Sequence, residues 1–247
     1  MRVLIAIPAR FGSTRLPGKA LADIGGEPMV ARVWRRCAAV RGVASVLVAT
    51  DDRRIAAAVA AAGGRAVLTL ASHASGTDRI AEAVRGEPCD LVLNVQGDEP
   101  FVEAGPLEAL LAVFSPGAPP EVATLATPIR DSADLANPAV VKVLVGRDGY
   151  AVYFSRLPIP WREAPPGEAG VAPGYLRHIG VYAYRPAFLQ RFTELEQTFG
   201  ERSERLEQLR ILEHGHRIRV VVTPWEALAV DTPEDLERAC ERAAREG

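Results

Sequence analysis

The part of the sequence with the clearest chemical content is a short basic segment, residues 8–19. It carries Arg10, Arg15 and Lys19 together with two glycines and two hydroxyl side chains. Glycines let backbone N–H groups approach an anion, and three cations match the charge of a polyphosphate. Lys19 and Lys142 are the only lysines among the 29 lysines and arginines, which indicates a specific need for an ammonium group at position 19. The segment predicts a phosphate-binding loop.

The spacing within this loop excludes two common phosphate-binding motifs. A Walker A loop has four residues between its first glycine and a Gly-Lys-Ser/Thr sequence. Here five residues separate Gly12 from Gly18, and Ala20 stands where the magnesium-binding hydroxyl would be. The Gly-x-Gly-x-x-Gly turn of dinucleotide-binding proteins does not occur in the sequence. A merely solvated basic loop is the alternative, but three cations after a predicted strand favour a binding role.

Two acidic segments that are distant in sequence are candidates for holding a divalent cation. Asp98 follows Gly97 directly after a predicted strand, and Asp231 precedes Thr232 near the end of the sequence. Mg²⁺ prefers a few carboxylates together with phosphate oxygens and water. Each aspartate also has a local interpretation, Asp98 as a turn residue and Asp231 as a helix cap. Both roles coexist if Asp231 faces a metal while Thr232 caps the following helix.

The elements that must position these groups alternate between strand and helix in the first half of the chain. Continuous apolar runs predict buried strands, and their alternation with helices predicts an α/β fold with a parallel sheet covered on both faces. Sites on such sheets lie beyond the carboxyl ends of the strands, where the phosphate loop and Asp98 both fall. The predicted strands are residues 3–7, 45–49, 66–70 and 91–95, and the predicted helices are residues 28–41, 53–62 and 77–85.

This regular alternation ends after about residue 115. A loop rich in proline and glycine is predicted at residues 115–120, and a longer excursion at residues 158–174. The final helix is expected to be capped by Asp231 or Thr232. The predicted strands are residues 122–129, 140–145, 150–154, 179–184 and 217–222, and the predicted helices are residues 186–196, 205–214 and 233–245.

The composition limits the classes of protein to be considered. Of the 247 residues, 48% are apolar and 24% are charged, which is the balance of a globular domain. The net charge of −2 and the lack of interleaved basic and aromatic residues argue against nucleic-acid binding. The longest uninterrupted apolar run, residues 55–62, is too short to span a membrane. Three widely spaced cysteines argue against a disulfide framework and suit the cytoplasm.

Taken together in chain order, these motifs resemble a known enzyme family. The first loop is similar to that of sialic-acid cytidylyltransferases and, more loosely, of other nucleotidyltransferases. The full set is more specific and resembles the 3-deoxy-manno-octulosonate (Kdo) cytidylyltransferases, or CMP-Kdo synthetases. The segments that carry the resemblance are residues 7–19, 75–79, 94–100, 153–156, 159–161, 177–182, 206–210 and 230–236.

The resemblance implies a fold, a reaction and a division of the chain. The fold is a Rossmann-like, three-layer nucleotide-diphospho-sugar transferase fold, with a mostly parallel mixed sheet and a β-rich excursion used in dimer formation. The reaction joins CTP and Kdo to give CMP-Kdo and pyrophosphate for lipopolysaccharide biosynthesis, in a cytoplasmic homodimer. We expect a single domain over residues 1–247, with a nucleotide-binding half at 1–115, a sugar-acid-binding and dimerisation part at 120–225, and a metal-ligand loop and helix at 226–247.

The resemblance also assigns the site residues. The catalytic residues would be Lys19, Arg10 and Asp98, and Mg²⁺ would be held by Asp98 and Asp231. CTP would be bound by Ala9, Arg10, Gly12, Ser13, Arg15, Lys19, Thr50, Ser75 and Gly76. Kdo would be bound by Arg79, Gln96, Arg156, His178, Tyr182, Glu207 and Gln208.

Without the resemblance, several of the sugar-acid residues have local interpretations. Arg79 lies on a predicted helix beside Asp78 and Glu82, with which it would form an ion pair. His178 would be packed or solvated on its strand, and Glu207 with the residue after it would be a solvated mid-helix pair. A sialic-acid cytidylyltransferase and a non-catalytic nucleotide-binding module remain as alternative functions. Activity on sialic acid alone would indicate the first, and CTP binding without pyrophosphate release the second.

Overall fold

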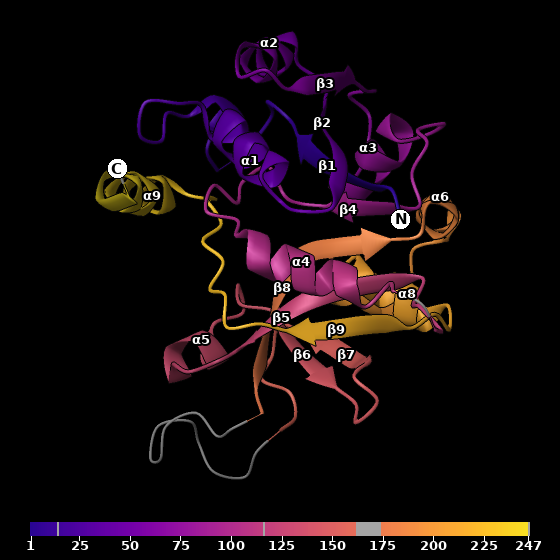
Figure 1. Ribbon diagram of the computed structural model, residues 1–247. Helices are drawn as coiled ribbons and strands as arrows, with labels where there is room; N and C mark the ends of the chain where they lie inside the picture. The colour runs from indigo at the N-terminus through magenta and orange to yellow at the C-terminus, as the bar shows by residue number, and fades with distance from the viewer. Residues whose placement is uncertain (14, 116, 162–173, 247) are drawn as a thin grey trace. The chain divides into compact units, whose positions relative to one another are not determined.

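The computed structural model describes residues 1–13, 15–115, 117–161 and 174–246 and divides into two compact units (Figure 1). The first unit comprises Met1–Glu108, Tyr184–Thr193 and Ala227–Gly247, and the second comprises Ala109–Ala183 and Glu194–Glu226. The excursion predicted at residues 158–174 lies mostly outside the described residues, as does part of the loop predicted at 115–120.

The first unit is built on four parallel strands in the order β3-β2-β1-β4 (Figure 1). The central strand β1 is buried along its whole length, because α1 and α3 pack against it and against β2. All pairs run parallel, so the carboxyl ends of the strands meet at one edge, with Ala9 of β1 opposite Thr50 of β2. The strands are β1 (Val3–Ala9), β2 (Val43–Thr50), β3 (Arg65–Leu68) and β4 (Leu91–Asn94).

Two helices of this unit, α2 and α3, begin at residues whose side chains satisfy their first N–H groups. Asp52 caps α2 by accepting from the backbone of Arg54, and Ser75 and Asp78 form a reciprocal capping box at the start of α3. The helices are η1 (Lys19–Leu21, a short 3₁₀ turn), α1 (Met29–Ala38), α2 (Arg53–Ala61), α3 (Gly76–Ala83), α6 (Pro186–Glu194) and α9 (Pro233–Glu246), and α4 (Ala104–Ala112) contributes its first five residues to this unit and its last four to the second.

The second unit contains both parallel and antiparallel strand pairs. Its strands β8, β5 and β9 are neighbours in that order, β5 and β9 run parallel, and β6 runs antiparallel to β7 and β8. The predicted α/β fold with a mostly parallel but mixed sheet is confirmed. The elements are β5 (Val122–Pro128), α5 (Ser132–Ala136), β6 (Lys142–Val145), β7 (Ala151–Ser155), β8 (Leu176–Tyr184), α7 (Phe199–Glu204), α8 (Gln208–Glu213) and β9 (Ile218–Val222).

A helix lies within the predicted range 205–214, but α8 is shorter than predicted and covers Gln208–Glu213. Arg205 has a left-handed backbone conformation, with φ of 53°, and it ends α7 before α8 begins at Gln208. Glu207 therefore stands at the entry to α8 rather than in the middle of a helix. The prediction also missed α4, α5 and α7, which are short or contain glycine and proline near their starts.

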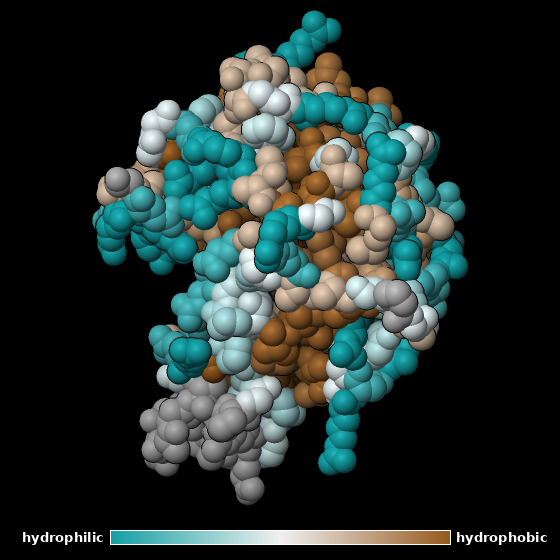
Figure 2. All heavy atoms as spheres, in the orientation of Figure 1, coloured by the Kyte–Doolittle hydropathy of each residue, from teal (hydrophilic) through white to brown (hydrophobic). Residues whose placement is uncertain are grey.

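On the face drawn in Figure 2, hydrophilic residues are spread around the surface rather than gathered into one patch. Among the described residues, no helix is both long and apolar enough to cross a membrane. The apolar side chains that the fold removes from water include Leu4, Ile5 and Ile7 of β1 and Leu125 of β5. Their burial supplies the main favourable free energy that holds the strands and helices in place.

Candidate active site

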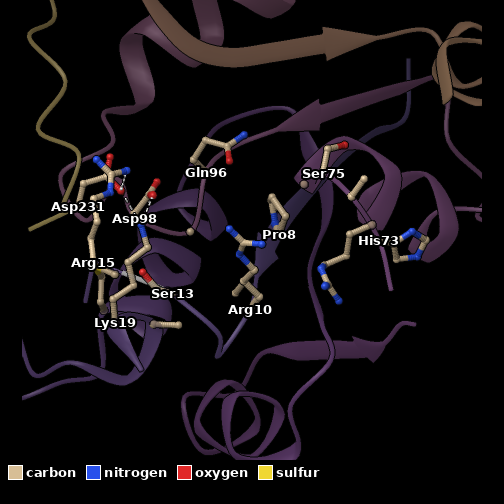
Figure 3. A pocket seen from close by; sticks show the side chains of 17 residues that line it. Pro8, Arg10, Ser13, Arg15, Lys19, His73, Ser75, Gln96, Asp98 and Asp231 are labelled. Carbon is tan, nitrogen blue, oxygen red and sulfur yellow. Dashed lines mark hydrogen bonds and ion pairs between the residues drawn. The ribbon is translucent and has the colours of Figure 1, made fainter. Parts of the chain in front are cut away.

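A cavity of about 400 Å³ opens within the first unit, beyond the carboxyl ends of β1 and β4 (Figure 3). Segments following β1, β3 and β4 and the segment preceding α9 all contribute to it. Lys19, Arg15, Asp98 and Asp231 gather at one end, whereas Ser75 and His73 lie at the other. The lining residues are Pro8, Ala9, Arg10, Ser13, Arg15, Lys19, Ala20, Met29, His73, Ala74, Ser75, Gly76, Arg79, Gln96, Gly97, Asp98 and Asp231.

Lys19 joins the two acidic segments at the charged end of the cavity. Its ammonium donates to Asp98 Oδ2 at 2.6 Å, to Asp231 Oδ1 at 2.9 Å and to the carbonyl of Val230 at 3.3 Å. Arg15 lies 3.0 Å from the same Asp231 oxygen. Burial works against the charge of Lys19, but the two carboxylates outweigh it and raise the pKa of the ammonium. The structure therefore brings together two of the cations predicted to bind phosphate, Lys19 and Arg15, and both carboxylates predicted to bind a metal.

Backbone packing places the two aspartates side by side. The backbone N–H of Val230 donates to the carbonyl of Asp98 at 2.9 Å, so the residues before Asp231 are tied directly to the Asp98 loop. Gly97 makes a close approach possible, because a Cβ on it would lie 2.7 Å from the carbonyl oxygen of Pro8. The end of β4 therefore packs against the end of β1, and Asp98 faces the phosphate loop.

One hydrophobic cluster supports all three charged segments of the cavity. Val230 and Phe101 are fully buried in it, and Leu16 of the phosphate loop packs against it. Phe101 follows Asp98 by three residues, and Arg242 of α9 lies over its ring at 4.4 Å. The final helix is therefore anchored to the Asp98 loop, and the segment carrying Asp231 is held between them.

The phosphate loop closes on itself through its backbone. The carbonyl of Phe11 accepts from the N–H groups of Ser13 and Gly18, at 3.0 and 3.2 Å. Gly18 has φ of 70°, a conformation that favours glycine, and it turns the chain into η1, which begins at Lys19. Arg10 is exposed at the middle of the cavity and forms no ion pair with any described residue. Its guanidinium is therefore available to an anion.

Four of the residues predicted to bind CTP either have structural roles at the cavity wall or do not line the cavity. The hydroxyl of Ser75 lines the cavity but bonds Asp78 in the capping box of α3. Gly76 packs tightly against Pro8, since a Cβ on it would lie 3.1 Å from the ring. Gly12 and Thr50 are not among the residues that line the cavity, and the Thr50 hydroxyl accepts from the backbone of Asp52.

Arg79 is buried and anchored, with 3% of its surface exposed. Its guanidinium bonds Thr69 Oγ1 at 2.7 Å, the carbonyl of Leu70 at 3.3 Å and Asp51 Oδ2 at 3.0 Å. Among the described residues its ion pair is thus with Asp51, and the local pairing with Asp78 or Glu82 that the residues alone indicated is wrong. Gln96, the other predicted sugar-acid residue of this unit, lines the cavity and donates to Asn94 Oδ1 at 3.1 Å.

His73 is a cavity residue that sequence reasoning missed. Its Nε2 forms a short contact with the carboxylate of Glu82, which also accepts from the backbone N–H of Leu70 at 3.0 Å. This hydrogen bond with His73 is the main reason that the pKa of Glu82 is lowered. The sequence could have indicated His73 by its position, since it follows a predicted strand and precedes Ser75 by two residues.

The remaining predicted sugar-acid residues belong to the second unit, where several of them cluster. His178 Nε2 lies 2.9 Å from the hydroxyl of Tyr182 and 3.2 Å from that of Thr124. Burial, assisted by the charge of Arg177, lowers the pKa of His178 to about 3. Burial raises the pKa of Tyr182, and the negative charge of Glu207 adds to this effect. His178 and Tyr182 are therefore neutral polar groups over the physiological pH range.

Gln208 and Arg156 complete the predicted set. Gln208 is 8% exposed, and its buried Nε2 has no hydrogen-bond partner among the described residues. An unpaired buried amide is costly, so a ligand oxygen would be favoured there. Arg156 is half-buried and donates to the carbonyls of Glu204, Pro138 and Arg205 at 2.7, 3.0 and 3.4 Å.

Comparison with known proteins identifies the family. The sequence profile of the cytidylyltransferase family matches residues 4–218. The 3-deoxy-manno-octulosonate cytidylyltransferase of Trichlorobacter lovleyi is 44% identical over 98% of this chain and 98% of its own. That of Syntrophobacter fumaroxidans is 50% identical over 96% of this chain and 95% of its own. The chain belongs to the 3-deoxy-manno-octulosonate cytidylyltransferase family.

A solved structure of CMP:2-keto-3-deoxy-manno-octonic acid synthetase in complex with CTP agrees with this assignment. It is 42% identical to this chain, covers 100% of both chains and superposes with a TM-score of 0.92. The predicted membership of the cytidylyltransferase family is therefore confirmed.

The donor set of this cytidylyltransferase fits Mg²⁺. Among the described residues, no group of three or more histidine, cysteine or acidic side chains could hold a metal by itself. Asp98 and Asp231 both reach the ammonium of Lys19, so their oxygens converge on one point. Two carboxylates that leave further positions to phosphate and water match the preference of Mg²⁺.

Proposed function

We propose that this protein catalyses the reaction of CTP with Kdo to give CMP-Kdo and pyrophosphate, a step of lipopolysaccharide biosynthesis. The observation that carries the proposal is the convergence of Arg10, Arg15 and Lys19 with Asp98 and Asp231 in one cavity of a chain that matches a family member over 98% of that member's length. Cations suit a triphosphate, and the paired carboxylates suit the divalent ion that accompanies it.

The first unit supplies the groups that bind and activate CTP. Lys19, Arg10 and Arg15 hold the triphosphate and stabilise the charge that develops as pyrophosphate departs. Ser13 and the backbone of the loop add N–H and hydroxyl donors. Lys19 now bonds both aspartates, and its ammonium would turn to phosphate oxygens when nucleotide enters.

Asp98 and Asp231 are the residues that would hold Mg²⁺. When bound, this ion supplies charge neutralisation at the phosphates and lowers the pKa of the attacking hydroxyl. Asp98→Asn keeps the side-chain size but removes the anionic oxygen. We expect it to abolish Mg²⁺-dependent turnover while leaving the thermal unfolding temperature within a few degrees of the original.

The residues proposed for Kdo are Arg79 and Gln96 of the first unit and Arg156, His178, Tyr182, Glu207 and Gln208 of the second. His178 and Tyr182 offer neutral hydrogen-bonding groups to sugar hydroxyls, and the Nε2 of Gln208 offers a buried donor. The geometry around Arg79 favours a role for its guanidinium in positioning the segment that holds Thr69 and Leu70.

The bond changes need positioning more than covalent help. The anomeric hydroxyl oxygen of Kdo attacks the α-phosphorus in line, and the bond from that phosphorus to the β-phosphate oxygen breaks. Pyrophosphate leaves with the electron pair, and the hydroxyl proton passes to solvent. We further propose that the active form is a cytoplasmic homodimer, as the resemblance implies.

Pyrophosphate release by the purified protein tests this function. CTP and Mg²⁺ are supplied with Kdo, with sialic acid, or with no acceptor, and pyrophosphate is followed by a coupled assay. We expect release with Kdo alone. Release only with sialic acid would select the sialic-acid cytidylyltransferase reaction instead, and CTP binding without release would indicate a binding module.

A further inference from the structure

The second lysine of the chain, Lys142, has no part in the function described so far. It is the first residue of β6, and none of its surface is exposed. Its ammonium donates to three backbone carbonyls, those of Arg156 at 2.6 Å, Val140 at 2.8 Å and Asn137 at 3.0 Å. All three N–H groups of the ammonium therefore have an acceptor.

The use of lysine at this position needs a specific reason. No carboxylate of the described residues lies within salt-bridge distance of Lys142, and burial together with the charge of Arg156 lowers the pKa of its ammonium. Burying a charge without a partner of opposite charge costs free energy, so a buried ammonium is expected only where its hydrogen bonds hold the surrounding structure. Three carbonyls converging on one point suit a compact ammonium and not a planar guanidinium, in a chain that otherwise uses arginine almost throughout.

The three bonds of Lys142 hold Arg156 at both of its ends. One bond fixes the carbonyl of Arg156 itself. The other two fix Asn137 and Val140, on either side of Pro138, whose carbonyl accepts from the Arg156 guanidinium at 3.0 Å. Both the backbone and the charged tip of Arg156 therefore depend on the position of the Lys142 ammonium.

Arg156 in turn holds the turn between α7 and α8. Its Nε donates to the carbonyl of Glu204 at 2.7 Å, and its Nη2 to that of Arg205 at 3.4 Å. The Glu204 carboxylate accepts from the backbone N–H of Arg156 at 3.0 Å. Arg205 has the uncommon left-handed conformation, which the surrounding contacts must maintain. Glu207 and Gln208 follow directly, so their placement depends on this turn.

These contacts still leave Arg156 able to bind an acid. They use three of the five N–H groups of the guanidinium among the described residues. Among the described residues, one N–H on each terminal nitrogen is unused and can donate to a carboxylate oxygen.

We propose that Lys142 is a positioning residue for the acidic sugar, acting through Arg156 and the turn that presents Glu207 and Gln208. This inference rests on the proposed function, since it takes Kdo as the acid that these residues bind. The cavity assigned to CTP is lined entirely by residues of the first unit, whereas the Lys142 network lies in the second. Loss of the Lys142 ammonium should therefore weaken the binding of Kdo much more than the binding of CTP.

Steady-state kinetics of Lys142→Met test the proposal. Methionine is an unbranched side chain only one atom shorter than lysine, and it removes the charge and the donors. We expect the KM for Kdo to rise about tenfold or more, because small displacements of binding groups have large effects, while the KM for CTP changes less than about twofold. Val143→Ala is the matched control, because Val143 is the next residue of β6 and is also buried. It destabilises the same strand without touching the network, and both KM values should stay unchanged.

An unchanged KM for Kdo in Lys142→Met, or a parallel rise of both KM values, would overturn the proposal. If Lys142→Met does not fold, Lys142→Arg is judged by the same comparison, since its planar group cannot meet the three carbonyls. If the original protein shows no turnover with Kdo, the proposed function fails separately. Hydrogen exchange then decides the positioning role: Lys142→Met, unlike Val143→Ala, must speed exchange at residues 204–208.

Discussion

Replacing Lys19 by methionine should tighten the binding of a divalent cation to the nucleotide-free protein. The Lys19 ammonium bonds Asp98 and Asp231, the two proposed metal ligands, at 2.6 and 2.9 Å. A metal entering without nucleotide must displace this internal cation. The side chains are 18%, 24% and 37% exposed, so each ion pair is only partly screened by solvent.

The size of the effect follows from these two ion pairs. An exposed pair contributes roughly 0.2–1 kcal/mol, and partly buried pairs lie toward the upper end of that range. Displacing both pairs costs about 1–2 kcal/mol, which corresponds to roughly a 5- to 30-fold change in affinity. Lys19→Met should therefore bind the metal more tightly by that factor while losing about a hundredfold or more in kcat, because a preorganised donor to the phosphates is gone.

Manganese binding measured by electron paramagnetic resonance provides the assay, because it reports free Mn²⁺ without requiring turnover. Arg10→Met is the matched control, since it removes one positive charge from the same cavity but breaks no ion pair among the described residues. The difference between the two variants isolates the direct competition of Lys19 with the metal. Equal Mn²⁺ affinities in both variants, or weaker binding by Lys19→Met, would refute the reasoning.

Three further predictions concern other parts of the structure. Gly97→Ala places a Cβ 2.7 Å from the Pro8 carbonyl, so urea unfolding should show a loss of about 1–3 kcal/mol and kcat/KM should fall, whereas Gly105→Ala, with open space around it, should show neither. The pKa of His178 is about 3 when folded against 6.5 normally, so only the unfolded chain gains this proton as pH drops from 6.5 toward 3. This group alone should lower stability by about 1.4 kcal/mol per pH unit, so the pH slope from urea unfolding should be smaller by that amount in His178→Asn. Cys37 is fully buried and its thiol pKa is raised, so a thiol reagent should modify Cys89 and Cys240 in the native protein and Cys37 only in denaturant; rapid modification of Cys37 would contradict its burial.

The sequence predicted best where chemistry and local pattern coincide. Arg10 and Asp98 come soon after continuous apolar runs, Lys19 closes the loop that Arg10 opens, and the parallel arrangement of such strands brings their ends to one edge. The start of α2, predicted at residue 53, also follows from a local rule, since the Asp52 side chain that caps the helix needs only the first turn.

Features that depend on contacts between residues far apart in the sequence could not be predicted from local sequence patterns. The ion pair of Arg79 with Asp51 joins residues on different elements, and local spacing instead favoured Asp78 or Glu82. The turn at Arg205 is maintained by Arg156, which lies 49 residues away. Nothing in the immediate sequence of Arg205 marks a left-handed residue, because that conformation is held by tertiary contacts and not by glycine.

The product formed from CTP and Kdo identifies the reaction directly. The purified protein is incubated with CTP, Mg²⁺ and Kdo, and the mixture is followed by phosphorus NMR and mass spectrometry. We expect loss of the triphosphate signals, the appearance of pyrophosphate, and one phosphodiester whose mass is that of CMP-Kdo. Intact CTP after prolonged incubation with active, folded protein, or a phosphodiester formed with sialic acid and not with Kdo, would contradict the proposed function.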